Sequence, residues 1–367
     1  MRGWYNTGMS AAVPLQTALP GAREATRAFL DRLDPARRVV VFCHFDADGL
    51  AAGAVFGRAL PRLGFQDVRV VPSGRGESAF SDPARTRLAE TGPAALIVTD
   101  LGVNGRGVLP GVPTLYVDHH QPDGLPGAEA TVVSGYPWHP IPASAWLAYE
   151  LLSPLADTSD LDWIAAVGTV SDLGDGAPWD ALPEIKKRHT AKWLREAVAL
   201  VNAARRAGAF DIGTALDLLM TATGPRDLAA EGAPGADRLR AYRTEVNAEL
   251  AVARRAAPRF SASGPYALIR LHSGAQIHPL IAQQWRGRLP GHAVIAANTG
   301  YLPDTVAFSM RTARADLNLP RLLQGTRVGD TGGSYGHGHD QASGGHLRPE
   351  AFDRLLDALG FDASVRV

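Results

Sequence analysis

Short apolar runs alternate with helical stretches along the first half of the chain. The first run, Val39 to Cys43, is rich in β-branched residues and stops at a polar segment, as expected of a fully buried strand. Similar runs cover 68–71, 94–99 and 113–117, and a helix of small residues is predicted from Leu50 to Leu60. Apolar runs without polar alternation, joined by helical connections, predict an α/β fold with a doubly wound parallel sheet.

Polar side chains follow the first of these strands at alternate positions. His44, Asp46 and Asp48 leave the strand tip together, and the spacing places them on one side of an extended segment. Two carboxylates and an imidazole would meet at the crevice of this parallel sheet, where the like charges of the carboxylates repel each other at neutral pH. A bound divalent cation is the simplest way to neutralise them. The alternative interpretation is an Asp-Gly turn in which Asp48 caps the following helix.

Two further strands end in the same chemistry. Asp100 follows the run 94–99, and Asp118, His119 and His120 follow the run 113–117. A single aspartate at a strand end is unremarkable, whereas three such ends with histidines are hard to explain as caps. The repeated pattern therefore predicts a metal centre at the carboxyl edge of the sheet.

Two later segments are expected to approach this edge. A helical stretch from Trp163 to Ser171 breaks at Asp172, whose carboxylate can reach the site, and Asp175 is more easily a turn residue. A helix from Pro142 to Leu152 is predicted to begin near the Asp118 strand tip, with Ser144 as its cap.

The second half of the chain begins with helices rich in arginine. The stretch 186–260 is predicted to be a solvated connector between two domains, and the alternative is that one of its faces borders a substrate channel. The rest has its own α/β rhythm, with strands expected at 266–271, 293–297 and 305–310 and a helix at 279–289.

A glycine-rich segment near the end is the most unusual part of this second domain. Glycines within 329–346 would let backbone amides approach an anion, and His339 could donate a hydrogen bond to a phosphate oxygen. Arg311 offers a planar fork that suits phosphate. The alternatives are a flexible connector, a metal pair formed by His337 and His339, and a surface salt bridge for Arg311.

The composition narrows the choice of substrate and of cellular compartment. The 367 residues carry 37 basic and 37 acidic side chains, and this balance mildly favours a small or short substrate over a long polyanion. The single cysteine, Cys43, excludes an internal disulfide and is predicted to pack in the core. No secretion signal and no apolar stretch of about 18 residues is present, so we expect a cytoplasmic protein with no membrane segment.

The ordered set of motifs resembles the DHH family of phosphoesterases. The resemblance rests on His44, Asp46, Asp48 and Asp100, then the Asp118-His119-His120 triplet that gives the family its name, then Asp172. The tail from Gly336 to Gly344 looks like the glycine-histidine signature of the family's associated C-terminal domain, and Ser309 with Arg311 is similar to its phosphate-binding strand. The similarity extends from Arg38 to about Phe361.

The resemblance implies an organisation and a set of roles. It implies an N-terminal extension at 1–35, a catalytic domain at 36–190, a helical connector at 191–260 and a substrate-binding α/β domain at 261–367. It also implies two Mn²⁺ ions, with Mg²⁺ as a weaker substitute: His44 and Asp46 would hold one ion, Asp48, His119 and Asp172 the other, and Asp100 would bridge them. Asp118 would orient His119, and His120 would face the scissile phosphate or support the site. The implied substrate-binding residues are Ser309, Arg311, Gly336, His337, Gly338, His339 and Ser343.

Departures from the family pattern bear on the substrate. The first motif, His-x-Asp-x-Asp-Gly, is that of RecJ-like exonucleases, yet no oligonucleotide-binding domain follows in this sequence. We therefore expect a phosphodiesterase acting on short oligoribonucleotides, linear dinucleotides such as pApA or cyclic di-AMP, releasing nucleoside 5′-monophosphates. The alternatives are a RecJ-like exonuclease on single-stranded DNA and a catalytically silent nucleotide-binding regulator. A homodimer formed through the second domain stays open.

Overall fold

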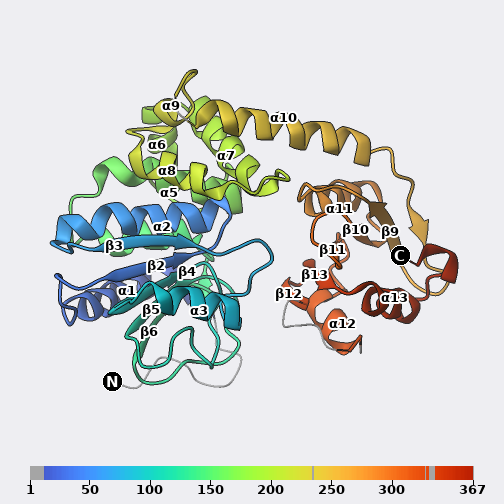
Figure 1. Cartoon of the computed structure of the whole chain (residues 1–367), viewed down its shortest axis with the longest axis horizontal. Coiled ribbons are helices and arrows are strands. Elements are labelled where there is room, and N and C mark those ends of the chain that lie inside the picture. Colours follow the sequence, from blue (N-terminus) through green and yellow to red (C-terminus); the bar gives the residue numbers. More distant parts are fainter. Residues whose placement is uncertain (1–11, 234, 327, 330–334, 367) are drawn as a thin grey trace. The chain divides into compact units, whose positions relative to one another are not determined.

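The computed structural model describes residues 12–366 apart from 234, 327 and 330–334. The chain divides into two compact units with three boundaries. Two of them fall inside helices, α7 (Ala191–Arg206) and α10 (Ala236–Ala253), and the third lies between Phe210 and Asp211. The first unit comprises Met1–Asn202 with Asp211–Leu239, and the second comprises Ala203–Phe210 with Arg240–Val367 (Figure 1).

The first unit is built on a five-stranded sheet in which every neighbouring pair is parallel. The strand order is β3-β2-β4-β5-β6, which confirms the predicted doubly wound parallel sheet. The strands are β2 (Val39–Cys43), β3 (Val68–Pro72), β4 (Ala95–Thr99), β5 (Thr114–Asp118) and β6 (Ala130–Ser134). Strand β6 was not expected from the sequence, because its half-exposed residues do not form an apolar run.

Helices cover both faces of this sheet. On one face α3 (Asp82–Glu90) packs its Ala84 and Leu88 against Val40 and Phe42 of β2. On the other face α2 (Ala47–Ala59) approaches so closely that a side chain at Gly53 would meet the buried Cys43. The remaining helices of this unit are α1 (Leu15–Leu30), α4 (Ser144–Leu152), α5 (Asp162–Leu173), α6 (Leu182–His189), α8 (Ile212–Thr221) and α9 (Pro225–Leu228). A short two-stranded sheet joins β1 (Val13–Pro14) to β7 (Trp138–His139).

The second unit is a six-stranded mixed sheet with the order β12-β13-β11-β10-β9-β8. Only β9 and β10 run parallel. The strands are β8 (Arg259–Phe260), β9 (Tyr266–Leu271), β10 (Ala293–Asn298), β11 (Val306–Thr312), β12 (Tyr335–His339) and β13 (Ala342–Leu347), and the helices are α11 (His278–Arg288), α12 (Leu319–Gly325) and α13 (Pro349–Ala358).

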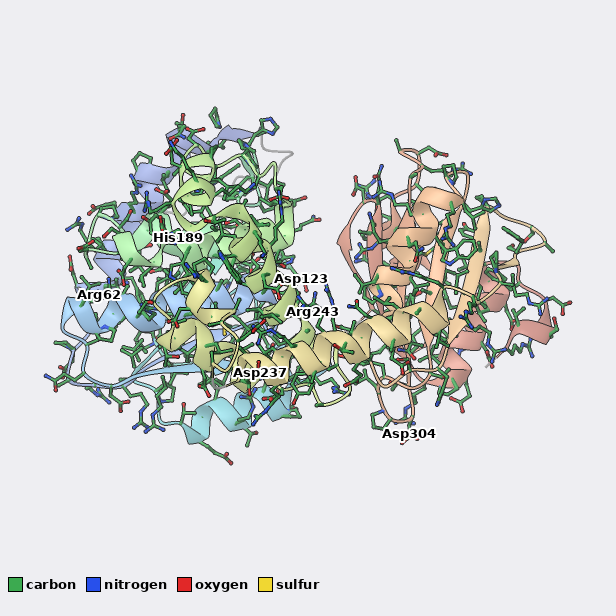
Figure 2. All side chains as sticks on the ribbon, turned by 90° about the horizontal axis from the view of Figure 1, so that it is seen from above. Arg62, Asp123, His189, Asp237, Arg243 and Asp304 are labelled. Atoms are coloured by element: carbon green, nitrogen blue, oxygen red, sulfur yellow. The ribbon has the colours of Figure 1, made fainter. Side chains whose placement is uncertain are left out.

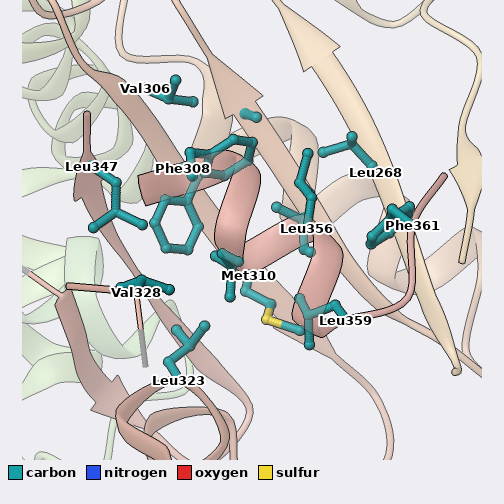
Figure 3. Close-up of a cluster of buried hydrophobic side chains, with 14 of the residues drawn as sticks. Leu268, Val306, Phe308, Met310, Leu323, Val328, Leu347, Leu356, Leu359 and Phe361 are labelled. Carbon is teal, nitrogen blue, oxygen red and sulfur yellow. The ribbon is translucent and has the colours of Figure 1, made fainter. Parts of the chain in front are cut away.

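Each face of this second sheet carries its own core. Leu268, Ile295 and Met310 point to one face, where α12 and α13 complete a cluster that includes Phe308 and Phe352 (Figure 3). The neighbouring strand positions point to the other face and pack against α10 and α11. The alternation of strand side chains therefore assigns any residue of β9, β10 or β11 to one of these two faces.

Several boundaries differ from the sequence prediction. The glycine-rich segment was expected to be a loop, but its described part forms the antiparallel hairpin β12–β13, whereas 330–334 lie outside the described residues. Gly344 allows this hairpin to pair closely with β11, since a Cβ there would lie 2.4 Å from the carbonyl oxygen of Phe308. The helix expected from Pro142 begins at Ser144, and the one expected to break at Asp172 continues to Leu173.

Charge differs between the two units. The second unit carries more basic than acidic side chains and the first more acidic than basic ones, and the two excesses cancel in the zero formal net charge. Nitrogen and oxygen atoms are nevertheless interspersed over the side chains of each unit (Figure 2). Among the helices that the structure describes, none is both long enough and apolar enough to cross a membrane.

Candidate metal centre

The first strand tip sets three side chains beside one another. His44 follows β2 directly, Asp46 caps α2 by accepting a 3.1 Å hydrogen bond from the Gly49 backbone N–H, and Asp48 lies in the first turn of that helix. The alternative interpretation of Asp48 as the cap is therefore wrong, because Asp46 occupies that place. Gly49 is required here, since a Cβ would lie 2.5 Å from the carbonyl oxygen of His44.

The neighbouring strand tips bring their polar residues to the same edge. Asp100 follows β4 and is buried, with a φ of +60° that few residues other than glycine adopt. Asp118 ends β5 and His119 and His120 come next. Because β2, β4 and β5 are adjacent parallel strands, their carboxyl ends meet.

Interatomic distances show how tightly these groups converge. His44 Nδ1 lies 3.2 Å from Asp46 Oδ1 and 3.5 Å from Asp100 Oδ2. His119 Nε2 lies 3.3 Å from Asp100 Oδ1. Asp172 reaches the same place from the last turn of α5, with Oδ2 3.7 Å from His119 Nδ1.

These residues form three overlapping groups of possible metal ligands. Within each group, one ligand atom of every residue lies within 4.8 Å of the others. Asp100 and His119 each belong to two groups, so the groups share ligands. The groups are His44 with Asp46 and Asp100, Asp48 with His119 and Asp172, and Asp100 with His119 and His120. Of the eight residues that the sequence analysis placed in the centre, Asp118 alone belongs to none of these groups.

The start of α4 holds two of the carboxylates in place. The backbone N–H groups of Ser144 and Ala145 donate to the two oxygens of Asp48 at 2.8 and 2.9 Å. The Ser144 hydroxyl donates to Asp100 Oδ1 at 3.0 Å. Ser144 therefore does not cap its helix as predicted, since Ala143 is the N-cap residue and no side chain bonds there. The sequence analysis missed this role, and its only signal was a helix start expected near the Asp118 strand tip.

His119 takes its orientation from a backbone carbonyl. Its Nδ1 lies 2.9 Å from the carbonyl oxygen of Pro142. A carbonyl only accepts hydrogen bonds, so Nδ1 carries the proton and donates it, and Nε2 is left as the metal-binding nitrogen facing Asp100. The prediction that Asp118 orients His119 is therefore wrong, because Pro142 supplies that contact from a loop that no motif marks.

Asp118 instead orients His120. One carboxylate oxygen, Oδ1, accepts from the His120 backbone N–H at 2.6 Å and lies 3.0 Å from His120 Nδ1. The other oxygen accepts from the Gly102 N–H at 2.7 Å. Although burial opposes its charge, the neighbouring His120 and His119 lower the pKa of Asp118. This fixed carboxylate makes Nδ1 of His120 the donor, and the ring stays 40% exposed.

A second set of sequence-predicted residues lies in the other unit. Arg311 is paired across the sheet with Val294, and Ser309 with Ala296, so both side chains leave the face that carries α11. Burial and the Arg286 guanidinium lower the pKa of Arg311, and its Nε is buried without a hydrogen-bond partner in the described structure. This is a place where an anion would be stabilised.

The other predicted substrate-binding residues do not all lie on the same face of the sheet as Arg311. Ser343 is paired with Met310, so its side chain leaves the opposite face of the sheet. Gly336 and Gly338 adopt positive φ values of 74° and 130° in β12. A Cβ at Gly338 would lie 2.3 Å from the Ala342 carbonyl oxygen. The backbones of His337 and His339 belong to β12, but their side chains lie outside the described part of the structure.

Known proteins match part of this sequence. Over 182 residues the chain is 29% identical to the single-stranded-DNA-specific exonuclease RecJ of Haemophilus influenzae, and over 245 residues it is 24% identical to that of Escherichia coli. These matches cover 42% and 57% of this chain, but only 32% and 42% of the relatives, so the chain matches less than half of their length. No protein-family model matches.

Solved structures extend the likeness to nearly the whole chain. RecJ from Thermus thermophilus in complex with Mn²⁺ superposes with a TM-score of 0.67 at 20% identity, over 95% of this chain and 55% of that one. An exonuclease RecJ bound to manganese gives 0.64 at 22% identity and covers 96% of this chain and 95% of that one. The chain is RecJ-like in sequence over the matched residues, and the architecture of its two main sheets matches that of these structures.

The side chains of this centre fit a divalent cation. Although burial favours a neutral ring, the carboxylates of Asp46 and Asp100 raise the pKa of His44 to about 10. Burial, followed by the Asp100 and Asp172 carboxylates, raises the pKa of Asp48. The raised pKa values show that these carboxylates crowd together, and a divalent cation would neutralise their charge. Mixed imidazole and carboxylate ligands suit Mn²⁺ and other first-row metals.

Proposed function

We propose that this chain is a metal-dependent phosphodiesterase that cleaves nucleic acid strands, with single-stranded DNA as its first substrate. The proposal rests on one observation, the three overlapping ligand groups, two of which contain Asp100 and two of which contain His119. Ligand groups that share members suit two cations side by side, as phosphodiester cleavage by two metals requires. The curated relatives are named as exonucleases specific for single-stranded DNA, which supports this choice of substrate.

The chain's own ligands divide into two sets. His44 and Asp46 would hold one cation, Asp48, His119 and Asp172 the other, and Asp100 lies between the sets. When bound, the cations would supply an activated water and neutralise charge on the phosphate. Within the chain, α4 fixes Asp48 and Asp100 by hydrogen bonds, and Pro142 fixes the tautomer of His119.

A role for His120 on the substrate itself is supported by its contact and its exposure. Its Nδ1 lies 3.0 Å from Asp118 Oδ1, and its side chain is 40% exposed. A histidine in this position can donate a hydrogen bond to a phosphate oxygen and a proton to the departing oxygen. We assign it that role and assign Asp118 a positioning role.

In the second unit, Arg311 is the residue we assign to phosphate binding. Its partly buried guanidinium lies on the face of α11, and Arg286 of that helix adds a second positive charge. Ser309 leaves the same face two residues away. These residues would bind a phosphate of the strand.

A Mn²⁺-dependent turnover series on the purified chain tests the function. The substrates are a single-stranded DNA of about forty nucleotides, an RNA of five residues, pApA and cyclic di-AMP. We expect the long DNA to be degraded most efficiently, and Asp46→Ala to abolish cleavage of all four. Binding of nucleotides without any turnover would overturn the proposal in favour of a silent regulator.

A second candidate is a phosphodiesterase for short nucleotides. The observation that favours it is the zero formal net charge, because a protein that follows a long phosphate backbone usually carries a basic excess. Its signature in the same series is faster hydrolysis of pApA than of long DNA, with weak dependence on salt. Arg311→Ala should then raise the KM for pApA far more than Arg314→Ala, whose guanidinium is paired with Asp316.

A further inference from the structure

A basic cavity lies in the second unit, at the edge of its sheet. It has a volume of about 390 Å³, and Arg259 of β8, Arg270 of β9 and Ser364 of the C-terminal turn line it with Ala256, Ala257 and Val365. Arg270 also borders a second cavity of about 220 Å³ that His272 and Thr299 line. Arg270 thus lines two cavities.

Strand register places both arginines on one face of the sheet. Arg259 is paired with Leu268, and Arg270 lies two residues further along β9, so the two side chains are diagonal neighbours. Leu268 points into the core shown in Figure 3. Arg311 lies on the opposite face, with α11. The basic cavity is therefore separate from the phosphate-binding position assigned to Arg311.

Neither arginine is neutralised within the described structure. No side-chain hydrogen bond or ion pair joins the guanidinium of Arg259 or Arg270 to any described residue. Two other arginines of this unit do have carboxylate partners, since Arg314 pairs with Asp316 and Arg366 with Asp357. The nearby Asp362 carboxylate accepts from the Ser364 backbone N–H. The two positive charges that face this cavity repel each other and would attract an anion.

We propose that Arg259 and Arg270 bind phosphodiester groups of a nucleic acid strand. This inference rests on the proposed function and deepens it by adding a second backbone contact for long substrates. Both guanidiniums are exposed, so each contributes weakly to binding of a single ion in water. Along a polyanion such contacts add together through counterion release, which makes a strand a better occupant than free phosphate. The Ser364 hydroxyl can donate to the same backbone.

Direct binding measurements test the site. A fluorescent single-stranded DNA of about twenty nucleotides is titrated with the whole protein in a chelator, at several salt concentrations. We expect the double variant Arg259→Gln/Arg270→Gln to bind on the order of tenfold more weakly at low salt. The slope of log affinity against log salt should fall by about 1.4, because each lost phosphate contact on a single strand removes about 0.7. The matched control, Arg314→Gln, should keep both values.

A second measurement separates a strand site from a general effect on the protein. Mn²⁺-dependent hydrolysis of pApA by the double variant should stay within about twofold of the original, because a dinucleotide offers too few phosphates to reach a second contact. Melting temperatures of the two proteins should coincide, since both side chains are exposed.

The outcomes distinguish this inference from the proposed function. If the original protein binds and cleaves DNA and the double variant matches it in affinity and salt slope, the arginine site is wrong and the function stands. If inorganic phosphate displaces the DNA at the concentration at which nucleotides do, and only when both arginines are present, the site takes free phosphate and the strand assignment is wrong. If the original protein neither binds nor cleaves any nucleic acid, both fail together.

Discussion

The Ser144 hydroxyl donates a 3.0 Å hydrogen bond to Asp100, the carboxylate shared by two of the three ligand groups. Ser144→Ala should therefore lower the affinity for Mn²⁺ by about 10- to 100-fold, because a shared ligand loses the contact that orients it. Calorimetric titration with Mn²⁺ measures this change. Ser153→Ala, at the other end of α4, is the matched control and should leave affinity unchanged. Equal affinity for all three proteins would mean that Ser144 does not orient the ligand.

Gly168 lets α5 approach the centre. A Cβ at this position would lie 2.4 Å from the Ala145 Cβ and 2.9 Å from Asp48 Oδ1. We expect Gly168→Ala to lower the free energy of unfolding by about 1–3 kcal/mol and to weaken Mn²⁺ binding, since Asp48 must shift. Denaturant unfolding and metal titration measure the two effects.

Two further variants test this explanation. Adding Ala145→Gly to Gly168→Ala removes the closer clash and should restore part of the stability. In the helix control, Gly21→Ala, nothing lies within 4 Å of the new Cβ, so this change should stabilise α1 by about 0.5–1 kcal/mol. A Gly168→Ala protein as stable as the original would refute the close-approach argument.

The sequence was sufficient to predict the parallel sheet and most residues of the candidate metal centre. Buried strands such as Val39–Cys43 are short apolar runs, and parallel strands must bring their carboxyl ends to one edge, so aspartates after three runs had to converge. The residues that hold them were not predictable in the same way. Asp48 bonds to α4 across 96 residues, and His119 bonds to a carbonyl 23 residues away. Backbone donors and acceptors leave no residue-type signal.

The glycine-rich tail illustrates a different limit. Glycine permits both a flexible loop and a strand that packs closely on its neighbour, and composition alone does not choose between them. Gly344 lies against the Phe308 backbone, a contact that exists only once β11 is in place. Pairing with β11 also sets which face each side chain leaves. Ser343 was therefore grouped with Ser309 and Arg311 from the motif, although register separates them.

Replacing the Asp172 carboxylate should stabilise the metal-free protein. It lies in the last turn of α5, where a negative charge opposes the helix dipole, and burial with the Asp100 and Asp46 carboxylates raises its pKa. We expect Asp172→Asn to raise the free energy of unfolding without metal by about 0.5–1 kcal/mol. The same variant should lose the extra stability that Mn²⁺ gives the original protein.

Thermal unfolding with Mn²⁺ and with a chelator measures both effects of that change. Asp175→Asn is the matched control, because Asp175 pairs with Lys186 and Arg195 and its replacement should not stabilise the protein. A destabilised Asp172→Asn protein without metal would show that this carboxylate is structural.

The two adjacent histidines should separate metal binding from catalysis. His120→Ala is expected to lower turnover by about 10²- to 10⁴-fold with little change in Mn²⁺ affinity, whereas His119→Ala should lose the metal. Because Asp118 acts through His120, Asp118→Asn should reduce turnover and cost nothing more when combined with His120→Ala. Single-turnover rates at saturating Mn²⁺ measure these effects. Additive losses in the double variant would mean that Asp118 has a separate role.

His278 should make the stability of the second unit depend on pH. Burial, with the positive Arg205 and Arg311 nearby, lowers the pKa of His278 to about 3, and the Tyr301 ring lies 5.5 Å from it. The unfolded chain takes up the proton near its ordinary pKa of about 6.5, whereas the folded chain does not. The free energy of unfolding therefore decreases as the pH falls below about 6.5, by up to about 1.4 kcal/mol per pH unit, until about pH 3.

Urea unfolding from pH 7.5 to 4 measures this dependence of stability on pH. His278→Gln should flatten it, and replacement of the exposed histidine, His272→Gln, should not. Parallel pH profiles for all three proteins would mean that His278 is solvated or protonated in the fold.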